Sequence, residues 1–157
     1  MDRAEVVAQL PGWLEDAGVA ADVAGEDRWM TMLAGEWKRT IQVLLHVDER
    51  HLRVRSMLCP AVEEQHAEVY GLLLHRNERS AALRFALDGV GDVVLLGQVP
   101  LQAVDAARLD ELLGEVLVTM DETFNPVLAK GFAAYIEREQ RWRESAGLDP
   151  NPAFPDA

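Results

Sequence analysis

Apolar residues recur at helical spacing near the start of the chain. Between residues 4 and 17 they form one stripe, and Glu5, Gln9 and Asp16 lie opposite it. This spacing predicts an amphipathic helix. Pro11 and Gly12 interrupt the pattern, so we expect a kink or two short pieces. The stripe consists of Val6, Val7, Leu10, Trp13, Leu14 and Ala17.

Alternating apolar and polar residues follow in three segments, 29–34, 39–47 and 51–58. A period of two is typical of strands with one buried face. Gly35-Glu36 and Asp48-Glu49-Arg50 supply turn residues between the segments. The pattern therefore predicts three antiparallel strands in a meander.

A second helix is predicted to begin at Pro60, because proline and the following Glu63 and Glu64 suit a first helical turn. We expect Asn77 to end this helix in the left-handed conformation. The face expected to be buried consists of Val62, His66, Val69, Tyr70, Leu73 and Leu74.

Two glycines separate the next strand segments, 82–87 and 92–99, within Asp88-Gly89-Val90-Gly91. In a phosphate-binding loop such glycines lead into a helix, whereas here another strand follows and the lysine of the nucleotide-binding motif is absent. The segments therefore predict a hairpin, in which Gly89 and Gly91 adopt positive backbone angles.

The last part of the chain has the spacing of two helices. One is predicted from near Asp105, with a stripe of Leu109, Leu112, Leu113, Val116, Leu117, Met120 and Phe124. Asn125-Pro126 has the pattern of an N-cap and a first helical residue, which predicts a separate last helix. Residues 146–157 are expected to form a flexible tail, and residues 1–145 a single domain.

Together these elements predict the α+β fold class. We expect a five-stranded antiparallel sheet with flanking helices, in the order α-β-β-β-α-β-β-α(-α).

Composition excludes several classes of partner. The 157 residues carry a formal net charge of −12, which disfavours binding to nucleic acid or anionic membranes. No apolar run approaches the roughly 18 residues of a membrane span. The N-terminus has no secretory-signal pattern, so we expect a cytoplasmic protein. Cys59 is the only cysteine, and we expect a buried, inert thiol.

No residue pattern in the sequence indicates an enzymatic reaction. Glu63 and His66 have the spacing of a helical metal half-site, but no second copy of that motif exists. The four histidines lie outside the metalloprotease motif, and the serines lie outside a nucleophile elbow. We therefore expect no catalytic residue, no metal and no cofactor.

A polar strip is predicted on the strand face opposite the core pattern. We interpret it in two ways: it receives an anionic ligand or an acidic segment of a partner, or its arginines pair with neighbouring carboxylates. Trp13 is expected in the core, whereas Trp29, Trp37 and Trp142 are candidate interface residues. The strip consists of Gln42, His46, His51, Arg53, Arg55, Arg84 and Gln98.

Three stretches of the chain are Leu72-Leu73-Leu74-His75-Arg76-Asn77, Arg84-Phe85-Ala86-Leu87-Asp88 through Asp92-Val93-Val94-Leu95, and Gln98-Val99-Pro100-Leu101. They resemble the YbjN family, over about residues 4–124. Its domains look like type III secretion chaperones, and its actinobacterial members, described as sensory-transduction regulators, are the most similar in style. The resemblance implies a curved antiparallel sheet flanked by helices, no catalytic residue, no cofactor and dimerisation. The chain departs from the family after Asn125.

These observations favour a non-enzymatic regulator or chaperone-like module, a homodimer that binds another polypeptide. The alternative is a binder of small anionic ligands, or a cryptic enzyme, that uses the arginines of the sheet face.

Overall fold

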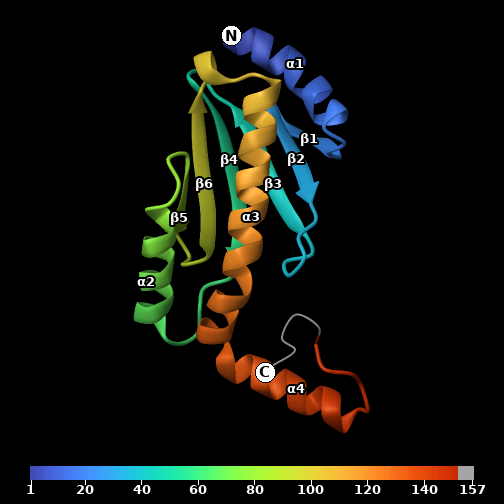
Figure 1. Cartoon of the computed structure of the whole chain (residues 1–157), viewed down its shortest axis with the longest axis vertical. Coiled ribbons are helices and arrows are strands. Elements are labelled where there is room, and N and C mark those ends of the chain that lie inside the picture. The colour runs from blue at the N-terminus through green and yellow to red at the C-terminus, as the bar shows by residue number, and fades with distance from the viewer. Residues whose placement is uncertain (152–157) are drawn as a thin grey trace.

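A six-stranded antiparallel sheet and four helices make up the computed structural model, which describes residues 1–151 (Figure 1). The strand order across the sheet is β1-β2-β3-β4-β6-β5. The elements are α1 (Arg3–Asp16), β1 (Ala21–Gly25), β2 (Arg28–Leu33), β3 (Ile41–Val47), β4 (His51–Cys59), α2 (His66–Asn77), β5 (Leu83–Leu87), β6 (Val93–Pro100), a 3-10 turn (Leu101–Ala103), α3 (Ala106–Gly131) and α4 (Ala133–Ser145).

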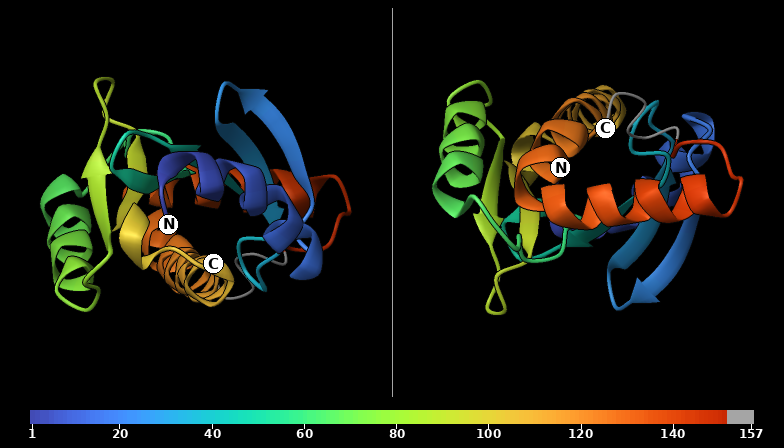
Figure 2. Two further views of the ribbon diagram at one scale, coloured as in Figure 1. Left: turned by 90° about the horizontal axis from the view of Figure 1, so that it is seen from above. Right: turned by 90° about the horizontal axis from the view of Figure 1, so that it is seen from below.

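The helices leave one face of the sheet uncovered. Viewed along the strands, α1 and α3 lie over the same face, and α2 flanks β5 (Figure 2). We call the helix-covered side the inner face and the opposite side the outer face. Within residues 1–151 no helix covers the outer face, as the alternation of buried and exposed residues along β3 and β4 also shows.

The core forms between the inner face and α3. Leu112 and Met120 of α3 have no exposed surface, and neither do Ile41 and Val43 of β3. Asp105 caps α3, because its Oδ1 accepts a hydrogen bond of 2.8 Å from the Arg108 amide. The stripe predicted from the sequence is confirmed as the buried side of α3, with Leu117 and Phe124 only partly buried.

Strand β1 was not predicted, so the expected five-stranded sheet has six strands. Its five residues are all exposed, and Val23 is 79% exposed. The strand pairs with β2 through its backbone, with Val23 opposite Trp29. An edge strand that buries no side chain leaves no period-two signal in the sequence.

Prolines were expected to shape both early helices. Pro11 lies inside α1, which is continuous from Arg3 to Asp16, so the expectation of two short pieces is wrong. The second helix begins at His66 rather than near Pro60, because Gln65 adopts the left-handed conformation (φ 50°) immediately before it. Glu63 therefore lies outside α2, so Glu63 and His66 do not form a helical half-site.

Asn77 ends α2 in a different way from the one predicted, since its φ is not positive. Its side chain instead bridges to β5: Nδ2 donates to the Phe85 carbonyl at 3.1 Å, and Oδ1 accepts from the Phe85 amide at 2.6 Å. This pair of hydrogen bonds fastens the end of α2 to the edge of the sheet.

The β5–β6 hairpin is confirmed, and it contains no phosphate loop. Asp88 organises the turn, because its Oδ1 accepts hydrogen bonds of 3.0 Å from the amides of Val90 and Asp92. Gly91 has a positive φ of 89°, as predicted, whereas Gly89 does not.

The prediction of a helix start at Asn125-Pro126 is wrong. Both residues lie inside α3, which continues to Gly131. The break comes at Phe132, whose φ of −134° and ψ of 28° separate α3 from α4. The carbonyl of Gly131 there accepts hydrogen bonds from the amides of Glu63 and Glu64 at 2.9 and 3.2 Å.

The segment after α4 was predicted to be a flexible tail over residues 146–157. Residues 146–151 turn back along α4, where the Asn151 amide donates to Gln140 Oε1 at 3.1 Å and Asn151 Nδ2 donates to Glu139 Oε1 at 3.2 Å. The rest of the predicted tail, 152–157, lies outside the described residues.

Candidate interaction surface

The outer face carries all seven residues of the predicted polar strip. Strand pairing places His46 opposite Arg53 and Arg53 opposite Gln98. Arg55 and Arg84 both lie opposite Leu96, one on each side of it. Gln42 lies on the same face of β3 as His46, and His51 on the same face of β4 as Arg53.

Arg28 is a further member of this surface that the sequence analysis missed. It is the first residue of β2 and lies opposite His46. The strand was predicted to begin at Trp29, one residue too late. The period of two through Met30 and Met32 places Arg28 on the outer face, so a longer strand prediction finds it.

A shallow hollow of about 540 Å³ lies among these side chains. It is open on the outer face and spans β2 to β5. The polar side chains that line it are all basic, and no carboxylate lies among them. The lining side chains include Arg28, His46, Arg53, Arg55 and Arg84.

Only two of the four arginines are paired within the described part of the chain. Arg53 contacts Asp48, which begins the turn before β4, and Arg55 lies 3.7 Å from Asp88 of the β5–β6 turn. Arg28 and Arg84 form no ion pair with any residue from 1 to 151. Pairing with neighbouring carboxylates, one of the two interpretations of the strip, therefore describes Arg53 and Arg55, and the binding of an anionic ligand or acidic segment stays a prediction.

Asp48 fixes the basic end of β4. Its Oδ1 accepts hydrogen bonds from the amides of Arg50 and His51 at 2.8 and 2.7 Å, and its Oδ2 accepts one from Arg53 Nε. Desolvation raises the pKa of this carboxyl, but the hydrogen bonds from Arg53 and the two amides outweigh it, so the pKa lies well below its usual range. Asp48 is therefore ionised at neutral pH.

Apolar side chains share the outer face with the arginines. Met32 and Met57 are 43% and 52% exposed. Met30, Leu44 and Leu96 are half-buried in the neighbouring row, which also contains Arg55 and Arg84. Met57 lies opposite Val94 and Met32 opposite Gln42, which makes this end of the face mainly apolar. The surface thus has a basic half and an apolar half.

The tryptophans separate into core and surface. Trp29 is only 8% exposed and packs in the core, which removes it from the candidate interface, because its ring lies on the inner face of β2. Trp37 and Trp142 are 43% and 60% exposed. The β2–β3 loop that carries Trp37 is fastened to α3 by Asp121, whose Oδ1 accepts from the amides of Trp37 and Lys38 at 2.8 and 2.9 Å.

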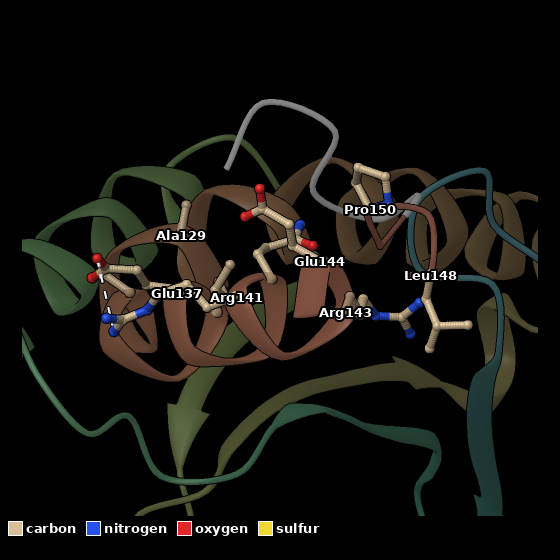
Figure 3. Close-up of a pocket in the computed structure, with 10 residues that line it drawn as sticks. Ala129, Glu137, Arg141, Arg143, Glu144, Leu148 and Pro150 are labelled. Atoms are coloured by element: carbon tan, nitrogen blue, oxygen red, sulfur yellow. Dashed lines mark ion pairs between the residues drawn. The ribbon is translucent and has the colours of Figure 1, made fainter. Parts of the chain in front are cut away.

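A second hollow, of about 690 Å³, lies between the end of α3, α4 and the segment after α4 (Figure 3). Most of its charged lining residues form ion pairs within α4. Glu137 pairs with Arg141 at 3.9 Å, and Arg143 pairs with Glu139 at 3.2 Å. This hollow offers mainly apolar surface from Ala129, Ile136 and Leu148.

The titratable side chains of the described chain offer no metal site. Among residues 1–151, no three His, Cys, Asp or Glu side chains are placed to hold a metal ion. Burial raises the pKa of the Cys59 thiol to about 11. The thiol is therefore protonated at neutral pH and is a poor nucleophile. No helix of the described chain has the length and apolar character to cross a membrane.

Residues 7–129 match the family model of YbjN, described as "Putative bacterial sensory transduction regulator". The chain belongs to the YbjN family. Among its relatives, an uncharacterised protein of Mycobacterium bovis is 44% identical over 115 residues, which are 73% of this chain and 63% of that protein. One of Mycobacterium leprae is 36% identical over 124 residues, which are 79% and 67% of the two chains. The YbjN-family chain thus spans less than two thirds of the length of the M. bovis relative.

Solved structures share the YbjN fold at low sequence identity. The crystal structure of YbjN from E. coli, titled a putative transcription regulator, has a TM-score of 0.53 and 13% identity over 78% of this chain and 89% of that one. The HopA1–SchA chaperone–effector complex contains a chain with a TM-score of 0.57 and 12% identity, over 79% and 98%. The ExoU–SpcU heterodimer from the type III secretion system of Pseudomonas aeruginosa has a TM-score of 0.53 and 18% identity, over 74% and 93%. The predicted α+β, secretion-chaperone-like fold is confirmed.

Proposed function

We propose that this YbjN-family protein is a non-enzymatic regulator or chaperone-like module that binds another polypeptide in the cytoplasm. The outer face carries the proposal, because it joins a basic half and an apolar half on a surface that no helix of residues 1–151 covers. We assign the activity to residues 1–145 as one domain.

The fold neighbours support a role in protein binding. Two of them come from structures titled as a chaperone–effector complex and as a heterodimeric complex. Exposed methionines support it too, because their flexible side chains adapt to different partners. No cofactor is part of the proposal.

Affinity capture from the native cytoplasm tests the proposal. Wild-type protein is compared with Met57→Lys, which places a charge in the apolar half of the outer face, and with Val118→Lys on the exposed side of α3 as control. We expect a polypeptide that the wild type and the control retain and that Met57→Lys loses by at least tenfold. Identical capture by all three proteins contradicts the use of this surface.

The alternative function is the binding of a small anion, or a cryptic reaction on one, in the hollow beside Arg53 and Arg84. The hollow of about 540 Å³ is the observation that favours it, since small-ligand sites have volumes of roughly 300–1,000 Å³. A thermal-shift panel of nucleotides, phosphosugars and acyl anions separates the two functions. Stabilisation that disappears in Arg53→Ala and Arg84→Ala supports the alternative.

We also propose that the chain forms a homodimer through the end of the molecule that carries Trp37 and Trp142. In Figure 1 the β2–β3 loop lies at the edge of the sheet on the side of α4, and both tryptophans are exposed. Sedimentation at micromolar concentration is expected to show a dimer that Trp142→Ala shifts towards monomer, whereas Val90→Ala in the β5–β6 turn does not. A wild-type monomer at that concentration contradicts the proposal, because a stable interface buries about 1,600 Å².

A further inference from the structure

We infer that the outer face binds an acidic segment of its partner, one that carries apolar side chains beside its carboxylates. The inference rests on the proposed function and names the chemistry of the polypeptide bound. It depends on the positions of four arginines, on the two that lack an ion-pair partner among residues 1–151, and on the apolar residues beside them.

The four arginines form a diagonal across the sheet. Arg28 and Arg53 both face His46, which places them two strands apart, about 10 Å. Arg53 and Arg55 are neighbours on the same face of β4, separated by about 7 Å along the strand. Arg55 and Arg84 flank Leu96 and are again about 10 Å apart. The diagonal crosses from β2 to β5, about 19 Å, which an extended segment of about six residues spans.

The positive charges at the two ends of this diagonal are not neutralised by residues 1–151. Asp48 and Asp88 neutralise Arg53 and Arg55 in the middle, whereas Arg28 and Arg84 have no ion pair with that part of the chain. One carboxylate, Asp22 of β1, lies at the β1 edge of the outer face, opposite Met30 of β2. Carboxylates from a partner supply the charge that the ends lack, and arginine binds them through paired hydrogen bonds.

Apolar side chains beside the diagonal favour a ligand that carries apolar groups as well as negative charge. Met57 lies two residues after Arg55 on the same face of β4, Met32 lies opposite Gln42, and both methionines are about half exposed. A ligand that contacts both halves therefore needs apolar groups about 7 Å, or two strand residues, from its carboxylates. A polypeptide with mixed acidic and apolar residues has both kinds of group, whereas inorganic anions have only the charge.

Charge disfavours the other large occupants of this face. The chain carries a net charge of −12, so nucleic acid gains contacts at four arginines while the rest of the surface repels its phosphates. A second copy stacked on the same face by a two-fold axis brings arginines towards arginines. An acidic polypeptide has neither disadvantage.

Panning of a random 12-residue peptide library on the intact protein tests the inference. We expect the selected peptides to combine Asp or Glu with Leu, Ile, Met or aromatic residues, and their affinity to fall at least tenfold between 50 and 300 mM NaCl. The test variant is Arg28→Glu with Arg84→Glu, which disturbs no ion pair of residues 1–151. Exposed Arg138 on α4 provides the control Arg138→Glu, and circular dichroism checks that each variant is folded.

The double variant is expected to bind the selected peptides at least tenfold more weakly, the control less than twofold. Peptides with Lys in place of Asp and Glu are expected to recover binding to the double variant. Selected peptides without acidic residues, or equal binding by the double variant, overturn the inference and leave the proposed function standing. Failure to select any peptide contradicts both. Preferential binding of a 12-nucleotide single-stranded DNA overturns the inference, as does self-association that the double variant abolishes.

Discussion

Leu112→Ala is expected to lower the free energy of unfolding by about 2–5 kcal/mol. Leu112 has no exposed surface and lies in the middle of the buried side of α3, the helix that covers the inner face of the sheet. Removing its side chain leaves a cavity between α3 and the strands, which close-packed neighbours fill only in part. Urea unfolding followed by tryptophan fluorescence measures the change.

Val118→Ala is the matched control on the same helix. Val118 is 54% exposed, so its truncation is expected to change the free energy of unfolding by less than about 0.5 kcal/mol. Similar losses from the two substitutions contradict the placement of α3 against the sheet. Loss from Leu112→Ala alone shows that the stripe, rather than the helical propensity of α3, stabilises the fold.

Gly97→Ala is expected to lower the free energy of unfolding by about 1–3 kcal/mol. Gly97 lies in β6 between Val54 and Leu83. A methyl group at its Cβ position lies 2.6 Å from Leu83 Cδ2, 2.7 Å from Val54 Cγ2 and 3.0 Å from the Ala82 carbonyl oxygen. These side chains have to move within a packed core, which strains the pairing of β4, β6 and β5.

Gly89→Ala, in the β5–β6 turn, is the control for Gly97→Ala. No atom lies within 4 Å of its Cβ position and its φ is not positive, so the substitution is expected to be neutral or to stabilise by about 0.4–1 kcal/mol. Thermal unfolding by circular dichroism compares the two variants. A Gly97→Ala protein as stable as Gly89→Ala contradicts the close approach of the three strands.

The central strands and α3 were predictable because an element with one buried face has apolar residues at regular intervals in its sequence. Ile41, Val43, Leu45 and Val47 alternate with more exposed residues along β3, and the structure buries all four. The same alternation along β4 correctly predicts Arg53 and Arg55 on the outer face. Residues whose environment is decided by the element on which they lie are therefore predictable from the sequence.

The errors occur where backbone contacts or the direction of a single side chain decide the structure. β1 pairs by backbone hydrogen bonds and buries no side chain, so no apolar pattern marks it. Pro126 suggested a helix start, but Val127 continues the buried side of α3 beyond it. The place of Trp29 near a strand end suggested an interface, whereas the inward direction of its side chain decides its burial.

The sequence predicts which face of the sheet carries the arginines, but not which of these arginines form ion pairs. Alternation places the arginines on one face, whereas the partners of Arg53 and Arg55 come from Asp48 and Asp88, which lie in two different turns. Sequence spacing does not show that these turns approach β4 while Arg28 and Arg84 stay without an ion pair among residues 1–151.

The separation of the two faces along β4 gives this fold freedom to diverge. Val54 and Leu58 point into the interior, while Arg53, Arg55 and Met57 point to solvent from the same strand. Exchanging the solvent-facing side chains alters what the sheet attracts without opening a void beneath it. A duplicated copy can therefore acquire a new binding preference through a few substitutions and still fold as its parent does.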